Sequence, residues 1–169
     1  MSECSNCGKT MLFARHTIEG RRYCSGDCAQ AHPILVVADR IPVHVLQQYV
    51  EKWRNGPCPR CKRVTGSVDV YSQHRVHSFL LMTQWSSRRA VSCRSCGRKS
   101  QLAGLAYSGL LGWWGVPWGL IVTPIQVTRN LFGALRGEPM RPTLAFEAVV
   151  RRQLAEAQIQ QEQASAEQR

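Results

Sequence analysis

CPRCKRVTGSVDVYSQHRVHSFLLMTQWSSRRAVSCRSC, residues 58–96, begins and ends with a C-x-x-C pair. Strand-like runs lie between the two pairs, at residues 67–71, 76–83 and 89–92. An antiparallel sheet would bring the pairs together, and four thiolates then form the tetrahedron that suits Zn²⁺. Residues 57–101 therefore predict a zinc ribbon whose ligands are Cys58, Cys61, Cys93 and Cys96.

The other four cysteines form a second cluster near the N-terminus. Cys4-Ser-Asn-Cys7 is a tight turn followed by Gly8, and residues 10–23 suggest a hairpin that turns near Glu19-Gly20. Cys24-Ser-Gly-Asp-Cys28 then opens a short helix. A turn, a hairpin and a helix whose first turn carries the last two ligands make the treble-clef arrangement, which we predict over residues 1–33. Its ligands are Cys4, Cys7, Cys24 and Cys28.

Cellular location decides whether such cysteines bind metal or form disulfides. The N-terminal sequence MSECSNCGK lacks the apolar run of a secretory signal, so we expect a cytoplasmic, reducing location. Cysteines that occur only as close pairs in such a chain indicate metal ligands. Two structural Zn²⁺ ions are the expected cofactors, and iron in rubredoxin-like sites is the alternative.

No catalytic motif accompanies the cysteines. Pro57-Cys58-Pro59-Arg60-Cys61 matches one half of the nucleotide-deaminase pattern, but no H-x-E or C-x-E sequence precedes it. HExxH, G-x-S-x-G and P-loop sequences are absent too. Four cysteines also leave zinc no open position for water. We therefore expect a non-enzymatic protein with no small-molecule substrate.

The remaining sequence predicts helices. Residues 34–56 form a connector with a helix from Pro42 to Gly56. Residues 102–135 form a hydrophobic helical segment, and residues 136–169 an amphipathic helix with a frayed tail. The fold class is thus small α+β zinc-stabilised modules, a treble clef and a zinc ribbon, followed by the hydrophobic segment and a C-terminal helix.

The hydrophobic segment is the most informative feature outside the cysteines, because residues 100–128 contain no charge. Its centre is rich in glycine, proline and tryptophan, which suits neither a straight transmembrane helix nor the usual interfacial place of tryptophan. Three alternatives stay open: an in-plane insertion bent at Gly115–Pro117, two short helices in a soluble core, and a single span. The predicted membrane- or partner-docking residues are Trp113, Trp114, Pro117 and Trp118.

The formal net charge is +11, and two filled four-thiolate zinc sites, each carrying about −2, would reduce it. The chain is therefore basic, but without the charge of a dedicated nucleic-acid binder. The leading hypothesis is an adaptor at the inner face of the cytoplasmic membrane or on a protein partner. The alternative is weakly specific nucleic-acid binding. In either case the predicted anionic-surface contacts are Arg60, Lys62, Arg63, Arg94, Arg98 and Lys99.

Two resemblances accompany these motifs. Residues 57–131, with GPCPRC, VSCRSCGRKSQL and GLLGWWGVPWGLIVTPIQVTRN, resemble a group of bacterial zinc-ribbon proteins of unknown function. The stretch YCSGDCAQAH in residues 23–32 resembles the second half of TRASH- or MYM-type zinc fingers. These resemblances imply zinc-binding architecture and bacterial origin, and they imply no activity.

Overall fold

The computed structural model describes residues 2–64, 66–79, 82–114 and 118–168, apart from the side chains of Phe79 and Trp85. The chain divides into two compact units. The first comprises Met1–Gln48 and Glu147–Arg169, and the second comprises Tyr49–Phe146. Two helices, α3 (Val43–Arg54) and α6 (Leu144–Glu167), run across the division.

Within the described residues, the first unit contains two very short antiparallel strand pairs and two complete helices, together with parts of α3 and α6. The predicted turn at Glu19-Gly20 is present, with both residues at positive φ. The short helix that contains Cys28 is capped by Ser25, whose hydroxyl accepts from the Cys28 N–H at 3.3 Å. The elements are β1 (Ser2–Glu3) paired with β2 (Thr10–Met11), β3 (His16–Ile18) paired with β4 (Arg21–Tyr23), α1 (Gly26–Gln30) and α2 (His32–Arg40).

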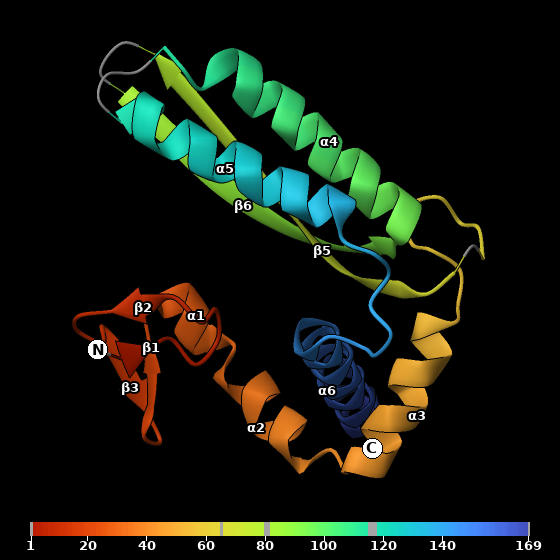
Figure 1. Cartoon of the computed structure of the whole chain (residues 1–169). Helices are drawn as coiled ribbons and strands as arrows, with labels where there is room; N and C mark the ends of the chain where they lie inside the picture. Colours follow the sequence, from red (N-terminus) through yellow and green to blue (C-terminus); the bar gives the residue numbers. More distant parts are fainter. Residues whose placement is uncertain (1, 65, 80–81, 115–117, 169) are drawn as a thin grey trace. The chain divides into compact units, whose positions relative to one another are not determined.

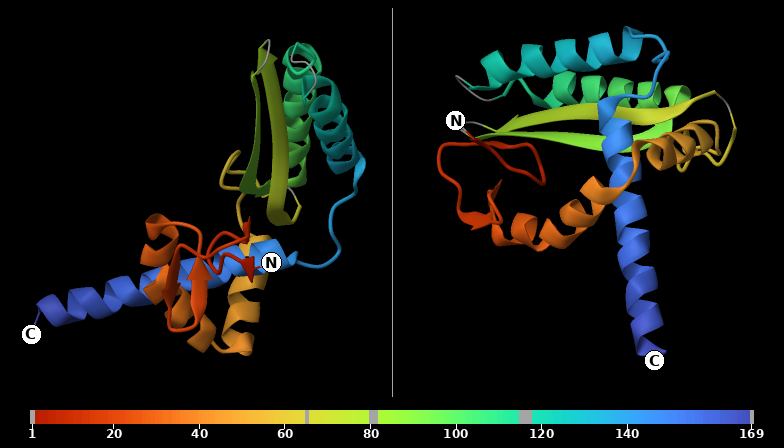
Figure 2. Two further views of the ribbon diagram at one scale, coloured as in Figure 1. Left: turned by 90° about the vertical axis from the view of Figure 1, so that its left-hand side faces the viewer. Right: turned by 90° about the horizontal axis from the view of Figure 1, so that it is seen from below.

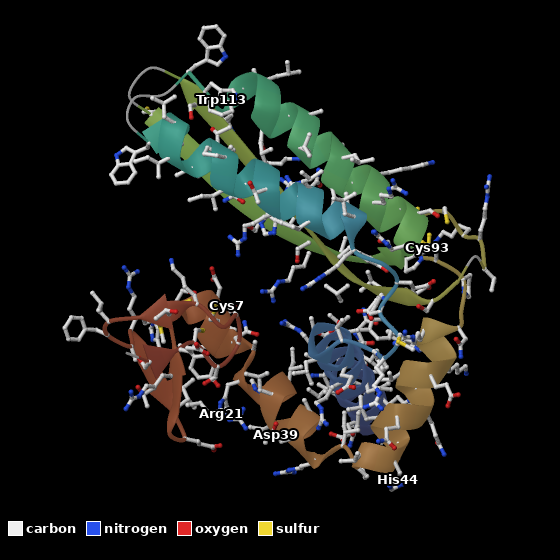
Figure 3. All side chains as sticks on the ribbon, viewed as in Figure 1. Cys7, Arg21, Asp39, His44, Cys93 and Trp113 are labelled. Atoms are coloured by element: carbon white, nitrogen blue, oxygen red, sulfur yellow. The ribbon has the colours of Figure 1, made fainter. Side chains whose placement is uncertain are left out.

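A small core holds this unit together around Tyr23, which is fully buried. The Tyr23 hydroxyl lies 2.8 Å from Nδ1 of His32, whose Nε2 lies 3.2 Å from a Glu19 oxygen. Arg21 forms an ion pair with Asp39 and so ties β4 to α2; both residues are labelled in Figure 3. Cys4 and Met11 complete the buried cluster, against which Cys24 and Cys28 pack.

The second unit is built on one long hairpin, β5 (Val68–Phe79) and β6 (Met82–Cys93). The strands pair antiparallel over their whole length, from Val68 opposite Cys93 to Phe79 opposite Met82. Three separate strand runs were expected, because residues 72–75 are polar and break the apolar alternation. The strand nevertheless continues through them, since helix side chains satisfy its backbone there, as described below.

Two helices follow the hairpin, α4 (Arg94–Leu111) and α5 (Trp118–Leu135). They lie side by side on one face of the hairpin (Figures 1 and 2). The hydrophobic segment thus forms two helices rather than one continuous helix, and the first of them begins inside the predicted ribbon. The expected bend at Gly115–Pro117 lies outside the described residues. Within the described ranges, no helix combines the length and the hydropathy needed to cross a membrane.

Candidate metal centres and an outward apolar face

The eight cysteines meet in two groups of four: Cys4, Cys7, Cys24 and Cys28, and Cys58, Cys61, Cys93 and Cys96. In each group all four sulfurs lie within 4.8 Å of one another. Zn–S bonds of about 2.3 Å place the sulfurs of a tetrahedral site about 3.8 Å apart. The observed separations of Cys7 and Cys24 at 3.6 Å and of Cys61 and Cys93 at 3.8 Å fit this spacing. Each group can therefore hold one metal ion.

Both groups begin with the same backbone turn. The N–H of Gly8 donates to the Cys4 carbonyl at 2.9 Å, and the N–H of Lys62 donates to the Cys58 carbonyl at 2.8 Å. Gly8 has φ of 68° and Lys62 has φ of 60°, so both occupy the left-handed region. Glycine adopts this conformation without steric cost, whereas lysine does not.

The last two ligands of each group also occupy similar positions in the fold. Cys28 is the third residue of α1, and Cys96 is the third residue of α4. Their partners Cys24 and Cys93 lie just before those helices. The second group was expected on a ribbon with two knuckles, but its final pair lies where a strand passes into a helix. A turn, a hairpin and a helix that carries the last ligand thus describe both modules.

The thiols of each group differ in how readily they ionise. Burial raises the pKa of Cys4, but the backbone N–H groups of Cys7, Cys24 and Asn6 outweigh burial and lower it to about 6. The pKa of Cys58 falls to about 6 in the same way, through backbone N–H groups that include that of Cys93, 3.2 Å from its sulfur.

The pKa values of Cys24 and Cys96 shift in the opposite direction. The sulfurs of Cys28 and Cys7 raise the pKa of Cys24 to about 12, and burial, with the sulfurs of Cys93 and Cys61, raises that of Cys96 to about 12. Four such thiols ionise together only beside a cation, as metal binding requires. The donor set therefore fits Zn²⁺, held by Cys4, Cys7, Cys24 and Cys28 in one module and by Cys58, Cys61, Cys93 and Cys96 in the other.

The helices of the second unit turn polar side chains toward the hairpin. The amide of Asn130 accepts from the His74 N–H at 2.9 Å and donates to the His74 carbonyl at 2.6 Å. Gln101 donates to the Ser72 carbonyl at 3.2 Å, and the hydroxyl of Ser108 accepts from the Val76 N–H at 3.1 Å. These side chains occupy the free edge of β5, which would otherwise offer unpaired backbone groups.

Small residues allow the helices to approach this closely. A Cβ at Gly97 would lie 2.4 Å from the ring of Tyr71, and one at Gly104 would lie 2.8 Å from the His74 carbonyl. Sequence reasoning did not identify this inner face. The signal was present as polar residues at helical spacing, Thr123, Gln126 and Asn130, within an otherwise apolar run.

Because polar and small side chains face inward, the large apolar ones face away from the hairpin. Trp114 is 71% exposed, Leu110 73% and Phe132 66%. We call this surface the outer helical face. Its members are Leu102, Leu110, Leu111, Trp113, Trp114, Trp118, Leu120, Ile121, Ile125, Leu131, Phe132 and Leu135.

The predicted docking tryptophans belong to this face, and Pro117 lies outside the described residues. Trp113 follows the end of α4, whereas Cys93 precedes its start, so the tryptophans and the second metal centre lie at opposite ends of the helix (Figure 3).

Comparison with protein-family models, with curated proteins and with solved structures found no match.

The predicted cations gather at the metal end of the unit. Arg60, Lys62, Arg63, Arg98 and Lys99 are exposed there. Arg60 also donates to the Ser100 hydroxyl at 2.7 Å. Arg94 instead donates to the backbone carbonyls of Ala134, at 2.7 Å, and Arg136, and so ties α4 to the end of α5.

Proposed function

We propose that this chain is a non-enzymatic zinc-binding adaptor that docks on the cytoplasmic face of an anionic membrane through the outer helical face. The observation that supports the proposal is the inversion of α4 and α5, by which we mean that these helices bury polar side chains and expose apolar ones. Amphipathic helices of water-soluble proteins usually bury their apolar side. Here Asn130 and Ser108 are fully buried, while Leu110 and Trp114 are mostly exposed. An extended exposed apolar surface usually marks an interaction site.

The distribution of side chains favours a membrane as the partner. Tryptophan prefers the interfacial level of a bilayer, and Trp113, Trp114 and Trp118 gather around the α4–α5 connection. Cations flank the apolar stretch at both ends of its sequence, with Arg98 and Lys99 at the start of α4 and the exposed residues Arg129 and Arg136 near the end of α5. The hydrogen bonds from Arg94 to the Ala134 and Arg136 carbonyls bring these two groups to the same end of the helix pair, opposite the tryptophans. Each such cation adds about 1 kcal/mol near an anionic surface. Helices that do not span a bilayer can lie in its interface.

The metal centres would have a structural role in this adaptor. Four thiolates fill the coordination sphere of Zn²⁺, so the ion has no position for a substrate or a reactive water. In the second module the ion would join the 58–61 turn to the start of α4 and so fix the helix that carries Leu102, Leu110 and Leu111 of the outer helical face. Zinc binding and membrane docking would then be linked through α4.

Vesicle pelleting with the full-length, zinc-loaded protein tests the proposal. We expect pelleting with phosphatidylcholine vesicles that contain phosphatidylglycerol and much less with phosphatidylcholine alone. Trp114→Gln with Ile121→Gln should weaken binding by about tenfold or more, since burying each side chain contributes about 1.5–3 kcal/mol. Leu12→Gln with Phe13→Gln is the matched control, because those exposed apolar residues belong to the first unit.

Three results would contradict the proposal. One is a wild-type protein that stays in the supernatant with every vesicle. Another is a docking variant that pellets as well as the control variant. The third is salt-sensitive binding to single-stranded DNA without any binding to vesicles, which would favour the nucleic-acid alternative. Oligonucleotide binding should be measured in the same buffers for that comparison.

A further inference from the structure

A groove of about 1120 Å³ runs along the second unit between β5, α5 and the segment that follows α5. Its volume lies slightly above the range of about 300–1,000 Å³ that is common for ligand sites. Val70 and Tyr71 line it from β5, Arg129 and Phe132 line it from α5, and residues 136–139 line it from the following segment. All of these residues belong to one compact unit.

One wall of the groove is apolar and continuous with the outer helical face. Phe132 and Leu135 line the groove, and both are about two-thirds exposed, at 66% and 67%. A hydrocarbon chain that lay against the outer helical face could therefore enter the groove without leaving an apolar surface. Soluble ligands without such a chain would gain little from this wall.

Next to this apolar wall the groove lining is positively charged, because Arg129 and Arg136 line it there. Among the described residues, neither guanidinium forms an ion pair with a carboxylate. Glu138 also lines the groove, but its Oε1 accepts from the N–H of Ser67 at 2.5 Å and from the Ser67 hydroxyl at 2.6 Å. The two arginines therefore offer donors to an anion, preferably a phosphate.

Two residues of the groove lining also carry buried polar atoms that lack partners. Gln101 is only 5% exposed, and its amide nitrogen donates to the Ser72 carbonyl while Oε1 has no hydrogen bond within the described structure. The buried Tyr71 hydroxyl likewise has no hydrogen bond within the described structure. An unsatisfied buried acceptor and donor cost free energy until a partner arrives. A ligand that carries both a hydroxyl and an anionic oxygen can satisfy them.

We propose that this groove binds the headgroup of one anionic, hydroxyl-bearing phospholipid. Its phosphate diester would lie at Arg129 and Arg136, its hydroxyl groups toward Gln101 and Tyr71, and its acyl chain along Phe132 and Leu135. The inference rests on the proposed membrane docking and deepens it, because it names the lipid class that the docked unit selects.

Short-chain lipids in solution test the groove separately from membrane docking. Calorimetric titration of the full-length protein with dihexanoyl phosphatidylglycerol, below its micelle concentration, should show binding at least about tenfold tighter than with dihexanoyl phosphatidylcholine. Arg129→Gln with Arg136→Gln should abolish that preference. Arg88→Gln with Arg89→Gln is the control of equal charge, because both arginines are exposed and lie outside the groove lining.

A second variant tests the space rather than the charge. Gly137 lines the groove, and a Cβ there would meet nothing within 4 Å. Gly137→Phe should therefore keep the fold and weaken the short-chain lipid by about tenfold or more, since it fills volume that the ligand needs. Vesicle pelleting of this variant should fall much less, because the outer helical face is intact.

The outcomes separate the two proposals. Vesicle pelleting without short-chain lipid binding would overturn the groove assignment and leave the membrane proposal standing. Equal affinity for inorganic phosphate and for the lipid would also overturn it, since the groove would then be a site for free phosphate. Binding that Gly137→Phe leaves unchanged would place the lipid elsewhere.

Discussion

The two cysteine modules share a local plan and differ in what surrounds it. Each begins with a turn closed by a residue in the left-handed region, continues as a hairpin and ends with a cysteine as the third residue of a helix. In the first module the hairpin strands have three residues each and the helix has five. In the second the strands have twelve residues each and the helix has eighteen.

This difference determines how much of the fold depends on metal. Buried cysteines belong to the core of both modules, but in the first the buried cluster consists of Cys4, Met11 and Tyr23 and is therefore very small. In the second, the hairpin extends far beyond the cysteines and is held by the hydrogen bonds of Gln101, Ser108 and Asn130. We therefore expect zinc to fold the first module and to complete the second.

Removing the equivalent helical ligand from each module should give the largest contrast. Structural zinc contributes about 10–16 kcal/mol of apparent binding free energy, so loss of one ligand is severe. Cys28→Ser should remove one zinc and the amide hydrogen-exchange protection of residues 2–31. Cys96→Ser should also remove one zinc, but most of β5, β6, α4 and α5 should stay protected.

Native mass spectrometry gives the metal count, and hydrogen exchange gives the protection of each segment. If Cys96→Ser unfolded the second unit as completely as Cys28→Ser unfolds the first module, the contrast between the modules would be lost. A wild-type protein with iron in place of zinc would contradict the choice of metal for both modules.

Close helix packing should produce the next largest effect. Gly97→Ala places a Cβ against the ring of Tyr71 and should destabilise the second unit by about 1–3 kcal/mol. Gly109→Ala, in the same helix, meets nothing within 4 Å and should stabilise it by up to about 1 kcal/mol. Denaturant unfolding that follows the second unit would measure both, and equal effects would contradict the close packing.

The sequence predicted the cysteine groups because each close cysteine pair is a local signal. It also predicted the turn between β3 and β4, since Glu19-Gly20 is a strong turn signal. It did not predict that β5 continues through Ser72–Arg75, because the side chains that satisfy that edge come from Gln101 and Asn130, which are distant in sequence.

The inversion of α4 and α5 was missed for a different reason. Apolar residues were expected either in a lipid phase or in a core, and a polar stripe inside an apolar run was not treated as the buried side. Thr123 and Asn130 are both fully buried, whereas Ile125 between them is about half exposed. Only the position of the hairpin shows which side of α5 faces inward.

Exchanging the residues that close the two turns should give a smaller effect of opposite sign. Lys62→Gly relieves a left-handed conformation and should stabilise the second module by about 1 kcal/mol, whereas Gly8→Lys should destabilise the first by about 1–2 kcal/mol. Competition with a chelator, with zinc release followed for each module, reports both changes. Effects of the same sign in the two modules would show that the turns are not equivalent.

The smallest expected effect on stability comes from the hydrogen bonds between Ser67 and Glu138 in the second unit. Hydrogen bonds from the hydroxyl and N–H of Ser67 hold the pKa of Glu138 below its ordinary value. A lowered carboxyl pKa stabilises the fold above the ordinary glutamate range, and the contribution is lost as pH falls through the folded pKa. Wild type should therefore be slightly more stable than Glu138→Gln at neutral pH, and thermal unfolding at decreasing pH should show the difference disappear. A difference that stayed constant with pH would contradict this origin.

Tryptophan fluorescence quenching by brominated lipids tests the membrane-docking role of the outer helical face most directly. Full-length, zinc-loaded protein with Trp53→Phe and Trp85→Phe retains only Trp113, Trp114 and Trp118. Phosphatidylglycerol-containing vesicles with brominated acyl chains should quench these tryptophans strongly, because they would lie in the bilayer interface. Unquenched fluorescence from folded, zinc-loaded protein would contradict the account and show that the outer helical face does not meet a membrane.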